Sequence, residues 1–109
     1  MKGERLGEFE ELTLLTVMAL GQGAYGVAVQ QYLEDVMGRE VSLGAVYAVL
    51  DRLERKGLVR STFGEVTRER GGKRKRLFEA TPAGRAAARD ARAVRESIWK
   101  AIVPTRTRS

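Results

Sequence analysis

The spacing of apolar residues is most regular in the segment 42–57, and it predicts a helix there. The apolar positions are separated by three, four and three residues, which places them on one helical face. They are Leu43, Val46, Leu50 and Leu53. Ser42 predicts an N-cap, because its hydroxyl can accept a hydrogen bond from an amide of the first turn. Gly57 predicts the end, since glycine adopts the left-handed conformation of a Schellman ending without steric cost.

The opposite face of this predicted helix is small and nearly uncharged at its N-terminal end. It carries Gly44, Ala45, Tyr47, Ala48, Asp51, Arg52 and Arg55. A solvated helix normally carries lysine and glutamate there. We therefore expect this face to allow another molecule to approach closely.

Two further helices are predicted before it, at 6–20 and 24–37. The first is apolar on more than one face, which favours one face in the domain core and another in a subunit interface. The second ends at Gly38, and only residues 39–41 separate it from Ser42. Such a helix pair fits a helix-turn-helix, although short helix pairs also occur in bundles.

A basic β-hairpin is predicted next. Residues 58–63 and 76–80 have strand composition, and 64–75 between them is polar and contains glycine. The window 68–76 holds six basic residues and one acidic residue. A basic hairpin directly after a candidate recognition helix is the arrangement of a winged helix-turn-helix. The alternative is an irregular basic loop on an unrelated fold.

The last predicted helix begins with Thr81 as N-cap and Pro82 as its first residue, and runs to about residue 103. Its apolar residues form a narrow stripe like a coiled-coil seam. The stripe consists of Ala87, Ala91, Val94, Ile98 and Ile102. We expect it to pack on the first helix of a second copy, and we expect 104–109 to be a disordered tail.

The fold class is therefore mainly α with a small β-hairpin. Residues 1–80 would form a winged helix-turn-helix DNA-binding domain and 81–103 a C-terminal dimerisation helix. The length of 109 residues fits a single small domain. No apolar run approaches the roughly 20 residues of a membrane span, and the N-terminus is too acidic for a signal peptide, so we expect a cytoplasmic protein.

Composition argues against an enzyme. Cysteine and histidine are both absent, which removes thiolate metal sites, the usual general base and the commonest transition-metal ligand. We expect no metal and no cofactor. Charge is unevenly distributed: residues 1–40 carry 3 basic and 7 acidic side chains, and 41–109 carry 17 basic and 7 acidic ones. The net charges of −4 and +10 indicate a polyanionic partner for the second part, nucleic acid before membrane.

These elements together resemble the PadR family of bacterial transcriptional regulators. The resemblance covers nearly everything from residue 6 to about 88 and lies in EFEELTLLTVMAL at 8–20, AYGV at 24–27, SLGAVY at 42–47, ERKGLV at 54–59, GGKRKR at 71–76 and LFEATPAG at 77–84. It implies a homodimer joined through the first and last helices that binds double-stranded DNA at a pseudo-palindromic operator and usually represses. It also implies that a planar aromatic or phenolic effector can bind at the dimer interface and release the DNA.

The predicted DNA-binding residues are Ser42, Gly44, Ala45, Tyr47, Ala48 and Arg52 on the helix and Lys73, Arg74, Lys75 and Arg76 on the hairpin. The family pattern suggests that Tyr47 hydrogen-bonds a phosphate; the alternative is a half-buried core tyrosine. Arg52 would reach a base edge or a phosphate, or pair with an acid such as Asp51 or Glu54. Because side chains alternate along a strand, not all four hairpin cations can point at DNA.

The predicted dimer interface consists of Phe9, Leu12, Leu15, Ala87, Ala91, Val94, Ile98 and Ile102. Trp99 has two interpretations. It would be an apolar anchor of that interface, or a stacking platform for a flat aromatic ligand.

Two other functions remain open at this stage. A winged-helix module that binds proteins would carry an apolar or acidic recognition face and a hairpin that is not basic. A nucleic-acid-binding protein without sequence preference would lose its target to random competitor DNA.

Overall fold

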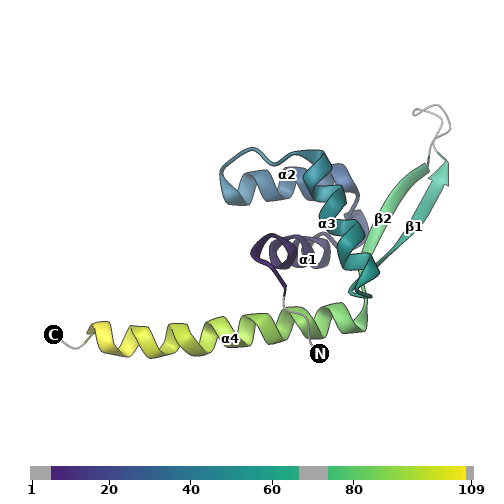
Figure 1. Cartoon of the computed structure of the whole chain (residues 1–109). Coiled ribbons are helices and arrows are strands. Elements are labelled where there is room, and N and C mark those ends of the chain that lie inside the picture. The colour runs from purple at the N-terminus through teal and green to yellow at the C-terminus, as the bar shows by residue number, and fades with distance from the viewer. Residues whose placement is uncertain (1–5, 67–73, 108–109) are drawn as a thin grey trace.

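The computed structural model describes residues 6–66 and 74–107, which form a small helical body with a hairpin on one side and a long helix below (Figure 1). The elements are α1 (Glu8–Leu20), the 3₁₀ turn η1 (Gly21–Gly23), α2 (Gly26–Met37), α3 (Leu43–Arg55), β1 (Val59–Val66), β2 (Arg74–Ala80) and α4 (Pro82–Thr107). The two strands are antiparallel. The predicted fold class, mainly α with a small β-hairpin, is confirmed.

The core lies where α1, α2 and α3 pack together and meet the base of the hairpin. Its largest fully buried side chains include Leu14 of α1, Leu33 of α2, Leu50 of α3 and Phe78 of β2. Leu50 belongs to the predicted apolar stripe of α3, and the other stripe residues Val46 and Leu53 are buried beside it. The fourth stripe residue, Leu43, is only half-buried, and Val49, which the pattern left out, is buried instead, so the pattern describes most of the packed face.

Both ends of α3 are formed as the sequence predicts. The Ser42 hydroxyl accepts a hydrogen bond of 3.0 Å from the Ala45 amide. At the other end Gly57 has a φ of 78°, and the Leu58 amide donates to the Leu53 carbonyl over 2.9 Å. With the 2.9 Å bond from the Gly57 amide to the Glu54 carbonyl, this is a Schellman ending.

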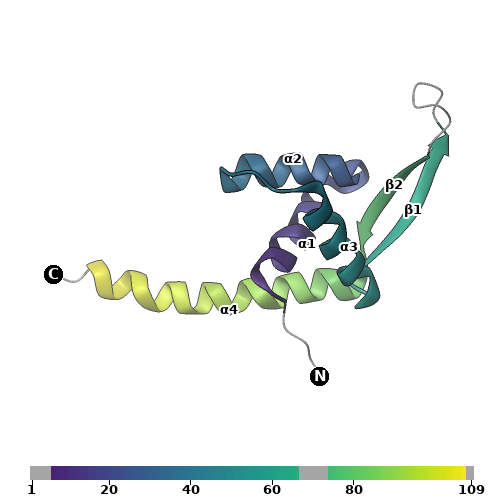
Figure 2. The same cartoon turned by 45° about the horizontal axis from the view of Figure 1, so that its top comes forward.

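The hairpin is longer than the predicted strands, and its base is attached to the helical body. The Phe78 amide donates to the Ala24 carbonyl over 3.0 Å, and Tyr25 forms an isolated antiparallel bridge with Leu77. Residue 25 is therefore extended, and α2 begins at Gly26 instead of residue 24. The attachment fixes the lower half of the hairpin next to α3, as both views show (Figures 1 and 2).

Thr81 connects the start of α4 to the end of α3. Its hydroxyl accepts from the Gly84 amide over 3.0 Å, which is the predicted N-cap, and donates to the Gly57 carbonyl over 2.7 Å. A Cβ at Gly84 would overlap the Leu58 carbonyl, so only glycine allows α4 to lie this close.

Beyond the body, α4 extends into solvent, and it does not end where expected (Figure 1). The helix runs through Thr107, past the predicted end at about residue 103, and 108–109 lie outside the described residues, so the disordered tail stays a prediction. Within residues 6–66 and 74–107, no helix is both long and apolar enough to cross a membrane.

Candidate nucleic-acid interface

The small face at the start of α3 is exposed on the surface. Ser42, Gly44, Ala45 and Ala48 are all exposed, and a Cβ at Gly44 would meet no atom within 4 Å. The helix N-terminus also presents amide groups and the positive end of the helix dipole. This part of α3 can therefore approach a flat or grooved anionic surface without steric hindrance.

Tyr47 lies at the boundary between this face and the core. Its ring is half-buried, with its centroid 6.3 Å from that of Phe78 and the two ring planes tilted by 54°. It also lies over Gly26, where a Cβ would overlap the ring and the hydroxyl. The ring position matches the half-buried alternative, while the phosphate contact of the hydroxyl stays a prediction.

Arg52 pairs with an acid, but not with Asp51 or Glu54. Its guanidinium lies 3.5 Å from a carboxylate oxygen of Glu10 in α1, and its side chain is 47% exposed. Residues one and two positions apart on a helix point in different directions, so the two acids named from the sequence cannot face it. Arg52 therefore leaves part of its side chain available on the surface of α3.

Glu10 is a buried carboxylate that the sequence analysis missed. It accepts 3.1 Å hydrogen bonds from the Lys56 ammonium and a 2.8 Å bond from the Gly7 amide. Burial raises the pKa of Glu10, but the bonds from Gly7 and the charge of Lys56 outweigh it, so the net pKa is lowered. The sequence could have indicated this burial, because Thr13 and Val17 follow Glu10 by three and seven residues and share its buried face of α1.

Two of the four predicted hairpin cations have described side chains, and both fold back onto the protein. Arg76 pairs with Glu54 at 2.8 Å and with Asp51 at 3.3 Å. The Lys75 ammonium lies 4.9 Å from the centre of the Tyr25 ring, within cation–π range. Lys73 lies outside the described residues, and of Arg74 only the backbone is described.

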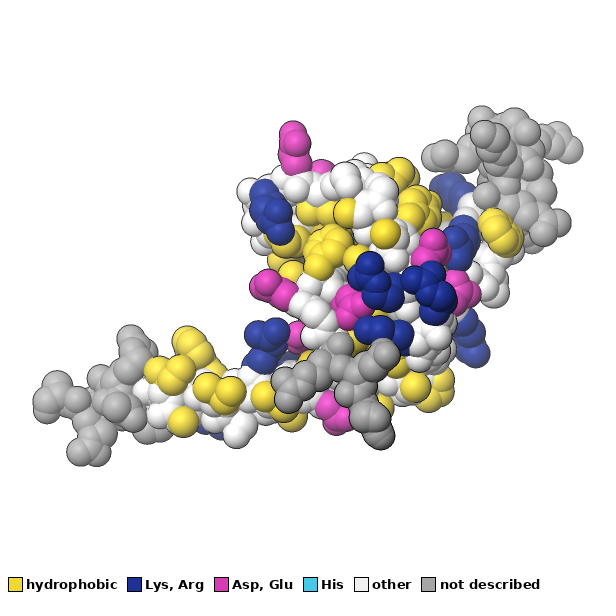
Figure 3. Space-filling view, viewed as in Figure 1, with side chains coloured by type: hydrophobic (Ala, Val, Ile, Leu, Met, Phe, Trp, Pro, Cys, Tyr) yellow, Lys and Arg dark blue, Asp and Glu magenta, His cyan; other side chains and the backbone are white. Residues whose placement is uncertain are grey.

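Lysine and arginine side chains nevertheless gather over α3 and along the hairpin, with acidic side chains between them (Figure 3). Among the described residues, no group of three or more histidine, cysteine, aspartate or glutamate side chains could hold a metal ion. The positive charges of this surface are suited to contact with phosphate groups.

The predicted dimer residues of α4 are exposed toward its C-terminal part. Val94, Ile98 and Ile102 are exposed, while Ala87 and Ala91 are half-buried near the body. Trp99 lies on the exposed part as well, with 58% of its surface accessible. On α1, Leu15 is exposed and Phe9 and Leu12 are half-buried. The structure contains one chain, so the dimer itself stays a prediction.

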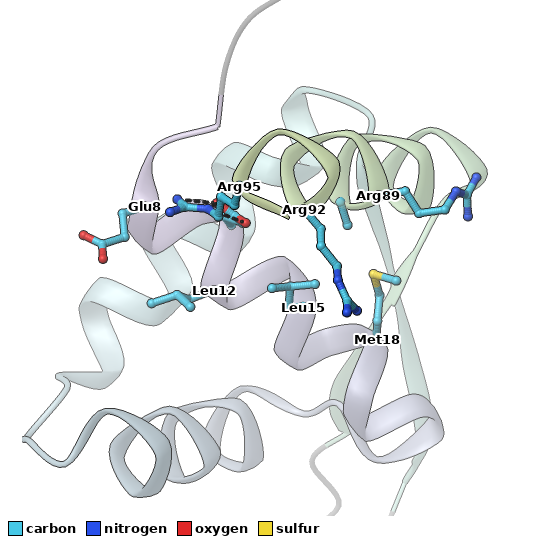
Figure 4. Close-up of a pocket in the computed structure, with 9 residues that line it drawn as sticks. Glu8, Leu12, Leu15, Met18, Arg89, Arg92 and Arg95 are labelled. Carbon is cyan, nitrogen blue, oxygen red and sulfur yellow. Dashed lines mark hydrogen bonds and ion pairs between the residues drawn. The ribbon is translucent and has the colours of Figure 1, made fainter. Parts of the chain in front are cut away.

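A cavity of about 490 Å³ lies between α1 and α4 (Figure 4). Leu12, Leu15 and Met18 of α1 form its apolar wall, and Arg92 of α4 extends toward this wall. Beside it, Arg95 donates to the buried Glu11 over 2.9 Å, and this bond and charge raise the pKa of Arg95. The cavity thus combines an apolar wall with positive charge.

Comparisons with known proteins agree with this architecture. The model of the PadR-like family of transcriptional regulators matches residues 14–90. The complex structure of hsRosR-S1 is 32% identical to this chain with a TM-score of 0.72, and the match covers 94% of this chain and 84% of that one.

More distant structures share the fold. A PadR family transcriptional regulator from Eggerthella lenta is 23% identical with a TM-score of 0.68, over 94% of this chain and 88% of the other. A PadR-like regulator from Bacillus cereus is 16% identical with a TM-score of 0.72, over 93% of each chain. A comparison with curated protein sequences found no match.

The family model covers well over half of the chain, and its members are regulators, not enzymes. The match runs from the middle of α1 through α2, α3 and the hairpin into the first turns of α4. The chain belongs to the PadR-like family of transcriptional regulators and is a DNA-binding regulator.

Proposed function

We propose that this regulator is a homodimeric repressor that binds a pseudo-palindromic operator through α3 and the hairpin. The observation that carries the proposal is the bare, exposed start of α3, where Gly44 has open space in front of it, directly beside a basic hairpin. In this arrangement α3 enters the major groove and the hairpin follows the neighbouring backbone.

Positioning on the DNA would come from phosphate contacts. The α3 N-terminus at Ser42 offers amide groups, Tyr47 its hydroxyl, and the hairpin the cations Lys73 and Arg74. Gly44, Ala45 and Ala48 would allow the backbone to come close to the groove. Base-edge donors are few on this face, with Arg52 the main one, so specificity would depend strongly on half-site spacing and DNA shape.

Dimerisation would use the apolar stripe of α4. Val94, Ile98 and Ile102 are exposed on a helix that extends beyond the body, and such a row of apolar side chains is unfavourable in water. The complementary surface would be Phe9, Leu12 and Leu15 on α1 of the second copy. Ile98→Glu should therefore give a monomer in sedimentation measurements, and an unchanged dimer would refute this interface.

An effector would bind at the same interface, and Trp99 allows this to be tested. Half-exposed in one chain, it would either anchor the dimer or stack on a flat aromatic ligand. Its fluorescence should change when planar cationic dyes or phenolic acids are added. Unchanged emission across such a panel would leave only the anchor role.

The decisive experiment is footprinting of the purified protein on DNA upstream of its own gene. A specific regulator should protect two half-sites and retain them against excess random DNA, while a protein without sequence preference should lose them. With about four phosphates contacted per subunit, the logarithm of the binding constant should fall against the logarithm of salt concentration with a slope near −7. Binding that hardly changes between low and moderate salt would refute the proposal. Repression itself would be read from a reporter placed behind the protected site.

A further inference from the structure

Arg76 occupies a central position between the hairpin and the recognition helix. It lies on β2 opposite Phe63 of β1, and its guanidinium reaches the last two turns of α3. One terminal nitrogen lies 2.8 Å from Glu54 and 3.3 Å from Asp51, and Nε donates to the Ser61 hydroxyl over 3.2 Å.

Other bonds strengthen the same junction. Glu54 also accepts the Ser61 amide over 3.2 Å and the Ser61 hydroxyl over 3.0 Å. The Arg76 guanidinium lies 4.8 Å from the centre of the buried Phe78 ring. One carboxylate of α3 therefore holds both strands of the hairpin, through Ser61 of β1 and Arg76 of β2.

We propose that Arg76 is a positioning residue, which fixes the hairpin against α3 and does not bind DNA phosphate itself. This inference rests on the proposed DNA-binding function and assigns a different role to one of the four basic residues of the hairpin. Two of the three guanidinium nitrogens bond to side chains of α3 and the hairpin, and only 29% of the side chain is exposed. Contact with phosphate would require these bonds to be exchanged for others.

Charge gives Arg76 a second effect on DNA binding. Asp51 and Glu54 lie on the recognition helix, and without a cation beside them their carboxylates would repel phosphate groups. Arg76 offsets one of these two negative charges from within the protein. Its loss should weaken DNA binding through the angle of the hairpin and through these two exposed charges.

A double-mutant cycle on DNA binding separates positioning from direct contact. Arg76→Met, Glu54→Gln and the double variant would be titrated against a labelled duplex that carries the footprinted site. If Arg76 acts through Glu54, the double variant binds no worse than Arg76→Met, which corresponds to a coupling of about threefold or more. If Arg76 binds phosphate, the two losses multiply, and the inference is overturned.

The matched control is Arg60→Met in place of Arg76→Met. Arg60 is a hairpin cation too, but it pairs with the exposed Glu79 on the outer side, 3.4 Å away. Its loss should combine independently with Glu54→Gln. This control shows whether removal of any positive charge from the hairpin gives the same coupling.

Two further readouts would not respond to a general loss of stability. A direct phosphate contact at Arg76 would lower the salt slope of the dimer by about 2 units in Arg76→Met, whereas a positioning role leaves the slope unchanged. Arg76→Lys keeps the charge but cannot reach both acids and Ser61 together, so it should bind more weakly than the wild type, although less weakly than Arg76→Met. Binding like the wild type by Arg76→Lys would overturn the inference. Wild-type protein that does not prefer its own upstream DNA would instead refute the proposed function.

Discussion

Replacement of Tyr47 by phenylalanine tests the recognition surface most directly. The hydroxyl forms no hydrogen bond to any residue within 6–66 and 74–107, while the ring packs against Phe78 and over Gly26. Tyr47→Phe keeps this packing and removes only the hydroxyl. Stability should therefore change by less than about 0.5 kcal/mol.

DNA affinity should respond much more strongly than stability. A hydrogen bond to a charged group contributes about 1.5–3 kcal/mol, so loss of a phosphate contact should weaken each half-site by about tenfold or more. Because phosphates carry no base information, operator DNA and random DNA should be affected alike. The assay is fluorescence anisotropy at one fixed salt concentration, with denaturant unfolding measured on the same samples.

Two variants complete this test. Tyr47→Ala removes the half-buried ring as well and should lower the free energy of unfolding by about 2 kcal/mol. Gly26→Ala keeps the tyrosine but displaces its ring and hydroxyl, so it should reduce both stability and affinity. If Tyr47→Phe binds DNA within about twofold of the wild type, the phosphate contact is refuted and Tyr47 is a packing residue only.

Two further predictions concern stability. Because the pKa of Glu10 is lowered in the folded state, its carboxylate stabilises the fold above its unfolded pKa, and this contribution is lost as pH falls through the lower folded pKa. Glu10→Gln should lower the free energy of unfolding by about 1 kcal/mol at pH 7 and should lose less stability than the wild type below about pH 4.5. An equal loss of stability in acid for both proteins would contradict the ion pairs of Glu10. Gly84→Ala should lower the free energy of unfolding by about 1–3 kcal/mol, because its Cβ would overlap the Leu58 carbonyl. Gly44→Ala has open space around its Cβ and should instead raise the free energy of unfolding by up to about 1 kcal/mol. Thermal unfolding of both variants measures the two effects.

Features set by neighbours in sequence could be predicted, and those set by distant contacts could not. The Ser42 cap, the Gly57 ending and the Thr81 cap each depend on a few adjacent residues, and all three are confirmed. The partners of the arginines depend on packing. Arg52 bonds to Glu10, 42 positions away, and Arg76 bonds to Glu54, 22 positions away. Composition identified the basic hairpin, but it could not show which of its cations face the protein.

The two acids at the start of α1 show how packing decides the partners of neighbouring residues. Glu10 and Glu11 are adjacent and both buried, and successive residues of a helix point about 100° apart. Glu10 therefore bonds to Arg52 of α3 and to Lys56 directly after it, while Glu11 bonds to Arg95 on α4. The first turn of α1 thus holds the recognition helix on one side and the C-terminal helix on the other. The contacts of α1 with α3 and with α4 therefore start from adjacent residues of one helical turn.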